Sequence, residues 1–515
     1  MTDRITTGSR AFAVLAVLLA GLPLQAEQDE KVAPEGPSLT VYSTASPGSF
    51  DPQAYIRANA GDNPYRSANV PGFGVVREVR RIEVPKGIGQ VRFTDVAAHI
   101  DPTTVAFSDL SGKGTRVLEQ NFEFDLVSPA KLLEKYVDQR IDLQWPETDT
   151  ALRGTLLATD GNRAVIENDG GEISIVPISD ARIGMGELPG GLITRPTLVW
   201  KLDSATGGER RIETSYQTAG LTWRADYNIT LDADSSSANL TAWVTLMNLS
   251  GASYENARLK LVAGDVQRVT PPAPTMRRGM MAMEDSLAAG ANGFEEQAFF
   301  EYHLYTLPRR TDVRMNSTQQ FTLFPPVRGF TTRKVLLYQG LPGMMRGGWG
   351  GQPATNRGFG ASSSSDVAVF IEFENDRENG LGMPLPAGKV RLSMANPNDG
   401  SLEFIGEDLI DHTPRNETVR LKAGNAFDVR GSRTQTDFKV DTGRKTMTET
   451  WSIELRNQKD VAQEVIVREP LYRWRNWELR SSDDYEKLDS RVVQWTVEVP
   501  AEGTRTITYT VVYTW

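Results

Sequence analysis

The sequence predicts a mostly β protein with several domains. Apolar and polar residues alternate with a period of two along many short segments, which is typical of strands that bury one face. Clusters of Asn, Asp and Gly separate several of these segments and favour tight hairpin turns. The length of 515 residues is enough for about two to four domains, each with its own core.

The first residues predict a secretory signal peptide, residues 1–26. Arg4 and Arg10 supply positive charge, an apolar run follows from Ala11 to Leu22, and Ala26 is a small residue at the expected cleavage point. A membrane-spanning helix needs about 20 apolar residues, and this run is shorter. No later stretch is apolar enough to cross a bilayer as a helix. We therefore expect a periplasmic or otherwise exported protein, cleaved after Ala26, with no transmembrane helix in the mature chain.

Charge and cysteine content exclude several classes of function. Residues 27–515 hold 54 Lys and Arg against 65 Asp and Glu, a net charge of −11. Nucleic-acid binding depends on clustered Lys and Arg, so no nucleic-acid partner is expected. The chain has no cysteine, which excludes disulfides, thiolate nucleophiles and cysteine zinc sites. The folded state must therefore depend on packing.

Residues 27–130 are expected to form an N-terminal β domain. Period-two alternation predicts strands over 75–84 and 91–96, and Pro85-Lys86-Gly87 predicts the turn between them. Residues 117–126 alternate in the same way. These segments have the length and pattern of half-buried strands.

Residues 131–194 predict a short helix followed by a small SH3-like β barrel, inserted between the N-terminal domain and the rest of the chain. Ser128 can cap the helix and Pro129 can open it. An apolar stripe at helical spacing follows, made of Leu132, Leu133, Tyr136 and Val137. Short strands are then expected over 142–144, 152–159, 163–167 and 172–177, separated by Asp160-Gly161-Asn162 and by 168–171.

Residues 195–515 are expected to form immunoglobulin-like β-sandwich units. The pattern apolar-x-apolar-x-Asn occurs at the ends of three predicted strands, over 244–248, 371–375 and 453–457. We expect each asparagine side chain to bond the backbone of the turn that follows. Two stretches rich in Gly, Ser, Pro or Met, 270–297 and 341–366, do not alternate and predict flexible loops.

Several motifs in this C-terminal region resemble one bacterial family. They are Tyr216 to Tyr227 (YQTAGLTWRADY), Tyr254 to Val266 (YENARLKLVAGDV), Leu385 to Arg391 (LPAGKVR), Gly406 to Pro414 (GEDLIDHTP) and Gly424 to Val429 (GNAFDV). In this order they resemble the family of domain of unknown function 4139, often labelled mucoidy-inhibitor-like, over roughly residues 195–515. Segments 117–126 and 132–137 also fit family members. Many relatives have a long coiled coil in the N-terminal half, whereas this chain has the small predicted barrel. The resemblance implies a fold, but it does not indicate any particular activity.

Candidate catalytic residues are few. Of the three histidines, His99 and His303 are expected to be strand residues, and no G-x-S-x-G nucleophile motif occurs. In a strand, Asp408 and His412 would share one face, while Glu407 and Asp411 would share the other. Asp408, Asp411 and His412 are thus weak catalytic candidates, because a carboxylate that orients an imidazole can begin an acid–base site. Two such ligands do not make a zinc site, so no metal or cofactor is expected.

Three functions remain open at this point. The leading hypothesis is a non-enzymatic exported envelope protein, a scaffold or binding protein that contacts another protein or a cell-wall polymer. The alternative is a carboxylate-dependent hydrolase that acts on an envelope glycan. A further alternative is an outer-membrane β-barrel, because Ile507, Tyr509, Val511, Tyr513 and Trp515 alternate up to a terminal aromatic residue. A last sandwich strand would show the same alternation.

Overall fold

The computed structural model describes residues 36–43, 48, 51–58, 70–112, 114–125, 127–187, 192–264, 266, 294–299, 302–341 and 351–515. Of these residues 62% lie in strands and 3% in helices, so the mostly β prediction is confirmed. The predicted signal peptide lies outside the described residues, as do 270–293 and 342–350 of the two predicted loops. Within the described part of the chain, no helix is both long and apolar enough to span a membrane.

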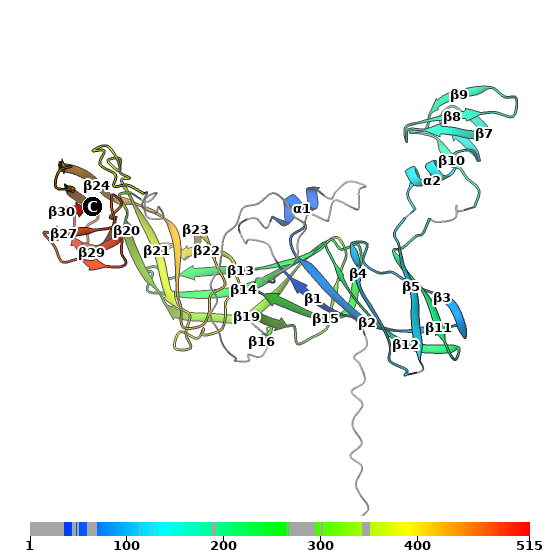
Figure 1. The fold of residues 1–515 in the computed structure, drawn as a ribbon, viewed down its shortest axis with the longest axis horizontal. Helices are drawn as coiled ribbons and strands as arrows, with labels where there is room; N and C mark the ends of the chain where they lie inside the picture. The colour runs from blue at the N-terminus through cyan, green and yellow to red at the C-terminus, as the bar shows by residue number, and fades with distance from the viewer. Residues whose placement is uncertain are drawn as a thin grey trace, which may run out of the picture. The chain divides into compact units, whose positions relative to one another are not determined.

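The first sheet joins strands from distant parts of the chain (Figure 1). Its order is β16 (Glu295–Phe299), β17 (Tyr302–Thr306), β15 (Tyr254–Ala263), β1 (Ser38–Tyr42), β2 (Phe73–Val84), β12 (Gly208–Thr218) and β4 (Ile100–Asp109), and β18 (Thr311–Val313) also pairs with β15. β1 runs parallel to β15, and β2 runs antiparallel to β12. β16 begins inside the segment that was predicted as a loop to residue 297. Within this sheet, β1, β2 and β4 are therefore completed by strands that follow residue 207.

A three-stranded sheet extends the same pattern. β11 (Thr197–Ser204) lies between β3 (Gly87–Thr94) and β5 (Thr115–Glu123), antiparallel to both. Its Trp200 is fully buried and packs edge-on against Phe93, with ring centroids 5.4 Å apart. The indole N–H of Trp200 donates to Gln120 Oε1 at 2.9 Å. The predicted strands over 91–96 and 117–126 are present, but they end at Thr94 and Glu123.

The segment after residue 128 forms a helix and a small sheet. The capping residues predict the helix, and the turn residues predict the hairpins of the sheet. In α2 (Pro129–Lys135), the Ser128 hydroxyl caps the helix by accepting the Lys131 N–H at 3.3 Å. The sheet order is β10 (Arg182–Gly184), β6 (Arg140–Trp145), β7 (Thr150–Thr159), β8 (Arg163–Glu167) and β9 (Ile173–Pro177). The five strands form an open sheet and not a closed barrel. The sheet does curl, because the Trp145 indole N–H on β6 reaches the Pro177 carbonyl at the end of β9, 3.2 Å away.

A second five-stranded sheet covers the largest core. Its order is β19 (Ser317–Thr331), β14 (Ser237–Asn248), β13 (Leu221–Leu231), β22 (Gly388–Ala395) and β23 (Leu402–Ile410). The inward residues of β13, among them Trp223, Tyr227 and Ile229, pack in one core with residues of the first and three-stranded sheets. The short helix α1 (Pro52–Ala58) adds Tyr55, which packs against Met247 and Leu249.

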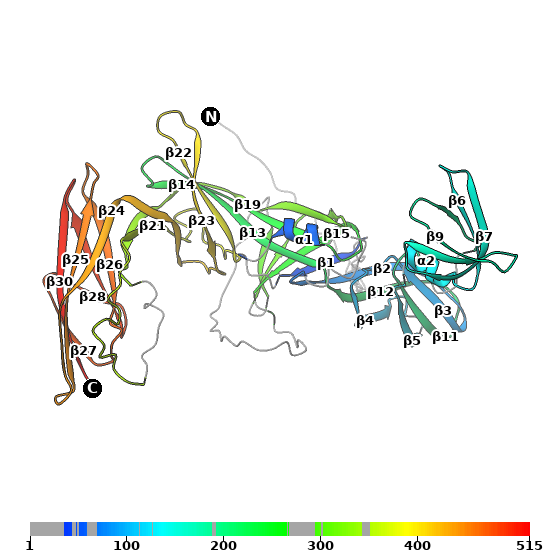
Figure 2. The same cartoon turned by 90° about the horizontal axis from the view of Figure 1, so that it is seen from above.

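The C-terminal sheet has nine strands and curls around its own core (Figure 2). Its order is β27 (Trp477–Ser481), β30 (Thr504–Thr514), β25 (Thr446–Asn457), β24 (Thr418–Asp441), β21 (Asp366–Glu374), β20 (Arg333–Tyr338), β26 (Gln463–Pro470), β29 (Val492–Val499) and β28 (Glu486–Lys487). Trp495 of β29 and Tyr509 of β30 have ring centroids 5.2 Å apart, although five strands separate them in the sheet order. The alternating C-terminal residues Ile507, Tyr509, Val511 and Tyr513 are all buried in this core.

The three asparagines that end an apolar-x-apolar-x-Asn pattern have the predicted role. Asn248, Asn375 and Asn457 are all buried, with 0–1% exposure. Each side chain bridges the turn that follows its strand: Asn248 bonds Ser250 N and Ala252 O, Asn375 bonds Gly382 N and Met383 O, and Asn457 bonds Lys459 N and Val461 O. A buried amide with both ends satisfied fixes the turn, so the local pattern was sufficient to predict these contacts.

Candidate functional site

The three residues singled out in the sequence contact different backbone segments. β23 ends at Ile410, so the strand alternation does not extend to Asp411 and His412. The Asp408 carboxylate accepts the N–H groups of Leu409 at 2.9 Å and of Lys422 on β24 at 2.6 Å. His412 Nδ1 accepts the N–H of Ala387 at 3.1 Å.

The Asp411 carbonyl accepts the Thr413 hydroxyl at 2.8 Å. Asp408 thus bonds a strand of another sheet, whereas His412 and Asp411 bond residues beside the turn that follows β23. The contacts of Asp408 and His412 therefore hold β23 and its following turn in place.

The other two histidines differ in their placement. His303 lies in β17, as predicted, and its Nδ1 is 2.7 Å from Glu296 Oε1 on the neighbouring strand β16. His99 lies in the turn before β4 and not in a strand, because β3 has ended and the backbone has a positive φ of 64° at Asp95. Burial lowers the pKa of His99. Among the described residues, no group of three or more His, Asp or Glu side chains could hold a metal ion.

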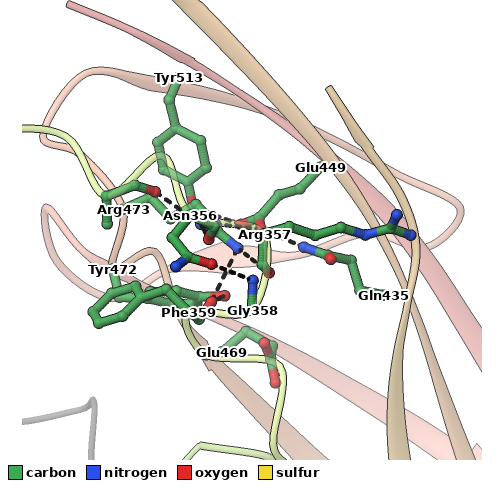
Figure 3. A network of polar contacts seen from close by, with 12 residues as sticks. Asn356, Arg357, Gly358, Phe359, Gln435, Glu449, Glu469, Tyr472, Arg473 and Tyr513 are labelled. Atoms are coloured by element: carbon green, nitrogen blue, oxygen red, sulfur yellow. Dashed lines mark hydrogen bonds and ion pairs between the residues drawn. The ribbon is translucent and has the colours of Figure 1, made fainter. Parts of the chain in front are cut away.

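A buried ionic network in the C-terminal sheet is the most unusual polar feature of the described residues (Figure 3). Arg433 Nε on β24 lies 2.7 Å from Glu469 Oε2 on β26, and Arg473 Nε lies 2.6 Å from Glu449 Oε2 on β25. The exposed fraction of all four side chains is 0–1%. Ion pairs in proteins are mostly at the surface, so two pairs without solvent access need a specific explanation.

Two tyrosine hydroxyls bond the two carboxylates of the network. The Tyr509 hydroxyl donates to Glu469 Oε2 at 2.6 Å, and the Tyr513 hydroxyl donates to Glu449 Oε1 at 3.1 Å. Burial raises the pKa of both tyrosines well above its ordinary value, so both hydroxyls keep the proton that they donate. Burial also raises the pKa of Glu469, while Arg433 and the Tyr509 hydroxyl favour its charged form. Because a guanidinium stays protonated in proteins, Arg433 presents a positive charge to Glu469 at 2.7 Å and favours the carboxylate form.

The two guanidinium groups also bond one loop, which we call the pinned loop (residues 354–360). Arg473 donates to four of its carbonyls, those of Ala354, Asn356, Arg357 and Phe359, at 2.8–3.3 Å. Arg433 Nη1 donates to a fifth, that of Gly360, at 2.9 Å. The loop has no strand or helix of its own, and these two side chains donate to five of its seven carbonyls.

Aromatic rings surround the two arginines. The Arg433 guanidinium lies 3.2 Å from the ring centroid of the fully buried Trp451, and the Arg473 guanidinium lies 4.6 Å from that of Phe438. Guanidinium planes stack well on aromatic faces, so the rings replace part of the lost hydration. Within the network, the carboxylate oxygen Glu469 Oε1 is buried and has no hydrogen bond to a described residue.

The pinned loop presents an aromatic side chain to solvent. Phe359 is 40% exposed, and its ring centroid is 5.6 Å from that of the partly buried Tyr472. Tyr472 also donates its hydroxyl to the Phe359 carbonyl at 3.3 Å. The arrangement can hold an exposed aromatic pair in a fixed position, which suits recognition of a binding partner.

The sequence reasoning missed this network, although it carried one signal. Glu449 alternates in phase with the buried residues Met447, Trp451 and Ile453 of β25, so a charge occupies an apolar row. A carboxylate on a buried strand face requires a buried cation. Alternation alone could therefore have indicated Glu449, but it could not have indicated Arg473 as its partner.

A family model described as "Domain of unknown function (DUF4139)" matches residues 212–515, which include the whole buried network. No curated protein matches the chain.

Proposed function

We propose that this chain, which belongs to the DUF4139 family of unknown activity, is an exported envelope protein. In this proposal it binds another protein or a cell-wall polymer without catalysis. The proposal places it in the periplasm or otherwise outside the cytoplasm, after cleavage at Ala26. The pattern of residues 1–26 supports the export, and the net charge of −11 over residues 27–515 makes a nucleic-acid partner unfavourable.

The observation that carries the binding proposal is the pinned loop. Burying two ion pairs is costly, and apolar residues of similar volume would often be at least as stable. Here the two arginines direct five hydrogen bonds at the carbonyls of residues 354–360, which have no other regular structure. Such an arrangement fixes the shape of an exposed loop, and a fixed loop binds with a smaller loss of conformational entropy.

The same network gives little support to the hydrolase alternative. A carboxyl group that acts as acid or nucleophile must reach the substrate. Glu449 and Glu469 are fully buried, and each is paired with an arginine and a tyrosine. Asp408 bonds backbone N–H groups. A binding function is thus the interpretation that these contacts favour.

The proposal includes a finer fold assignment for residues 131–194. Five short antiparallel strands in the order β10-β6-β7-β8-β9, curled so that Trp145 reaches Pro177, support an SH3-like sheet. SH3 domains bind extended proline-rich segments in aromatic-lined grooves. This assignment agrees with a binding role.

We expect Phe359→Ala to weaken binding to the envelope partner by about tenfold, because the exposed ring is the kind of anchor that dominates interface energies. The measurement is co-sedimentation with purified cell-wall sacculi, in parallel with crosslinking to a detergent-solubilised envelope fraction. Phe427→Ala is the matched control, since Phe427 is an aromatic residue of β24, outside the pinned loop, that is 86% exposed. Equal retention of the two variants on both probes would contradict the role of the loop.

Export has its own test. The protein expressed with residues 1–26 should be recovered outside the cytoplasm, with a mass that corresponds to a chain beginning at Glu27. Cell fractionation followed by intact-mass measurement checks this. Replacing Leu15, Val17 and Leu19 with aspartate should abolish both export and processing, because it interrupts the apolar run. Cytoplasmic recovery of the unmodified chain with its first residues intact would contradict the localisation.

A further inference from the structure

The edge strand β9 of the small sheet leaves apolar side chains in solvent. β9 is the last strand in the sheet order and pairs with β8 alone among the described residues (Figure 1). Ile173 and Ile175 are 60% and 69% exposed, and both point away from the core of the sheet. Large exposed isoleucines on an edge strand are a liability that proteins usually avoid.

The alternation of β9 explains why both isoleucines face outward. Ile166 of β8 is buried, and Val176 of β9 packs against the same small core. Ile175 is paired with Val165 of β8, whose side chain lies on the outer face. Because side chains alternate along a strand, Ile173 and Ile175 form an apolar row on the outer face beside Val165. The same edge carries backbone groups that a further strand could pair with, apart from the Pro177 carbonyl, which accepts the Trp145 indole N–H.

The usual protections of an edge strand are absent from the middle of β9. Lysine, an inward charge, proline or a bulge commonly blocks pairing. In β9 a proline occurs only at the end, Pro177, and the register with β8 runs from Ile173 to Pro177 without a shift. The row of Ile173, Ser174, Ile175 and Val176 contains no charge.

We propose that the β9 edge binds an extended, basic segment of a partner protein by strand addition, with apolar side chains of that segment packed on Ile173 and Ile175. Main-chain hydrogen bonds would supply affinity, and the alternate side chains would supply specificity. The site lies outside residues 212–515 and on a different sheet from the pinned loop. The inference rests on the proposed binding function and adds a second surface to it; because Phe359 lies outside this sheet, the tests of the two surfaces can fail separately.

Charge determines the kind of partner. Residues 140–184 hold four arginines and eight acidic side chains, a net charge of −4. Arg140 and Arg153 already pair with Asp169 and Asp142. Glu167 and Glu172 flank the edge at the start of β9. A basic segment is attracted by this surface, whereas a second copy of this acidic sheet is repelled.

The test uses the purified protein and two fluorescent octapeptides. One alternates Lys and Val, and the other alternates Glu and Val. Fluorescence anisotropy should show binding of the Lys–Val peptide and at least about tenfold weaker binding of the Glu–Val peptide. A Lys–Val peptide with N-methylated backbone amides should also lose binding by about tenfold, because it cannot pair with the strand edge.

Two substitutions test whether the Lys–Val peptide binds at β9. Ile175→Lys places a like charge in the row and should weaken binding of the Lys–Val peptide by about tenfold or more. Ile88→Lys is the matched control, because Ile88 is 66% exposed on β3 in another sheet, and it should bind as the unmodified protein does. Circular dichroism verifies that both variants are folded.

Three results would overturn the inference. They are equal affinity for the two peptides, undiminished binding by Ile175→Lys, and self-association of the protein that Ile175→Lys abolishes. The last result, read from sedimentation velocity, would assign the edge to a second copy of the chain instead of a basic partner.

Discussion

Glu469→Ala is expected to lower the free energy of unfolding by about 3–5 kcal/mol. The substitution leaves the guanidinium of Arg433 fully buried without its counter-ion, 3.2 Å from the Trp451 ring centroid. It also removes the acceptor of the Tyr509 hydroxyl. An unpaired buried charge costs far more than the ion pair contributes, so the loss is large even though the pair itself adds little net stability.

Urea denaturation followed by tryptophan fluorescence measures this effect, since Trp451 and Trp495 are both buried in the same core. Glu454→Ala is the control: Glu454 is 45% exposed and faces Arg456 at 3.7 Å on the same strand, and such pairs contribute at most about 1 kcal/mol. The double variant Arg433→Met with Glu469→Leu should recover part of the loss, because it removes both charges. A loss for Glu469→Ala no larger than for Glu454→Ala would show that the network is not needed for stability.

Gly406→Val is the second large effect, an expected loss of about 3 kcal/mol from overpacking. A Cβ at Gly406 would lie 2.2 Å from the Ala423 carbonyl oxygen and 2.9 Å from the Ala423 carbonyl carbon. Both atoms are backbone atoms of β24, so no side chain can move aside. The glycine allows β23 to cross β24 closely, and Asp408 then reaches the N–H of Lys422.

The shift in the urea or thermal midpoint relative to the unmodified protein tests this prediction. Gly351→Ala serves as the control, because a Cβ there meets no described residue within 4 Å. Unchanged stability of Gly406→Val would imply that β23 and β24 separate without cost. In that case the Gly406–Pro414 motif would need an explanation other than packing.

Contacts within a few residues were largely predictable from the sequence. The cap at Ser128 and the three buried asparagines depend on residues close to them in the chain, so local patterns identify them. Long-range pairing was not predictable in this way. β1 finds its parallel neighbour β15 more than 200 residues later, and alternation gives no information about which strand is the neighbour.

At the candidate site, too, the long-range arrangement could not be predicted from local sequence patterns. An unbroken strand would place Asp408 and His412 on one face, but β23 ends between them. The end of a strand depends on where its partner strands end, which is a tertiary property. Arg433, Glu469 and Tyr509 come from three strands and meet only because the nine-stranded sheet curls on itself.

The order of residues along the chain was enough to establish that this protein is mostly β, where many of its strands and turns lie, and which family it resembles. Those properties follow from side-chain alternation, turn chemistry and motifs along the chain. Which charges are buried together, and which loop they hold, became visible only in the folded chain. That choice depends on the curvature and order of the sheets, and these are set by pairings between residues that are distant in sequence.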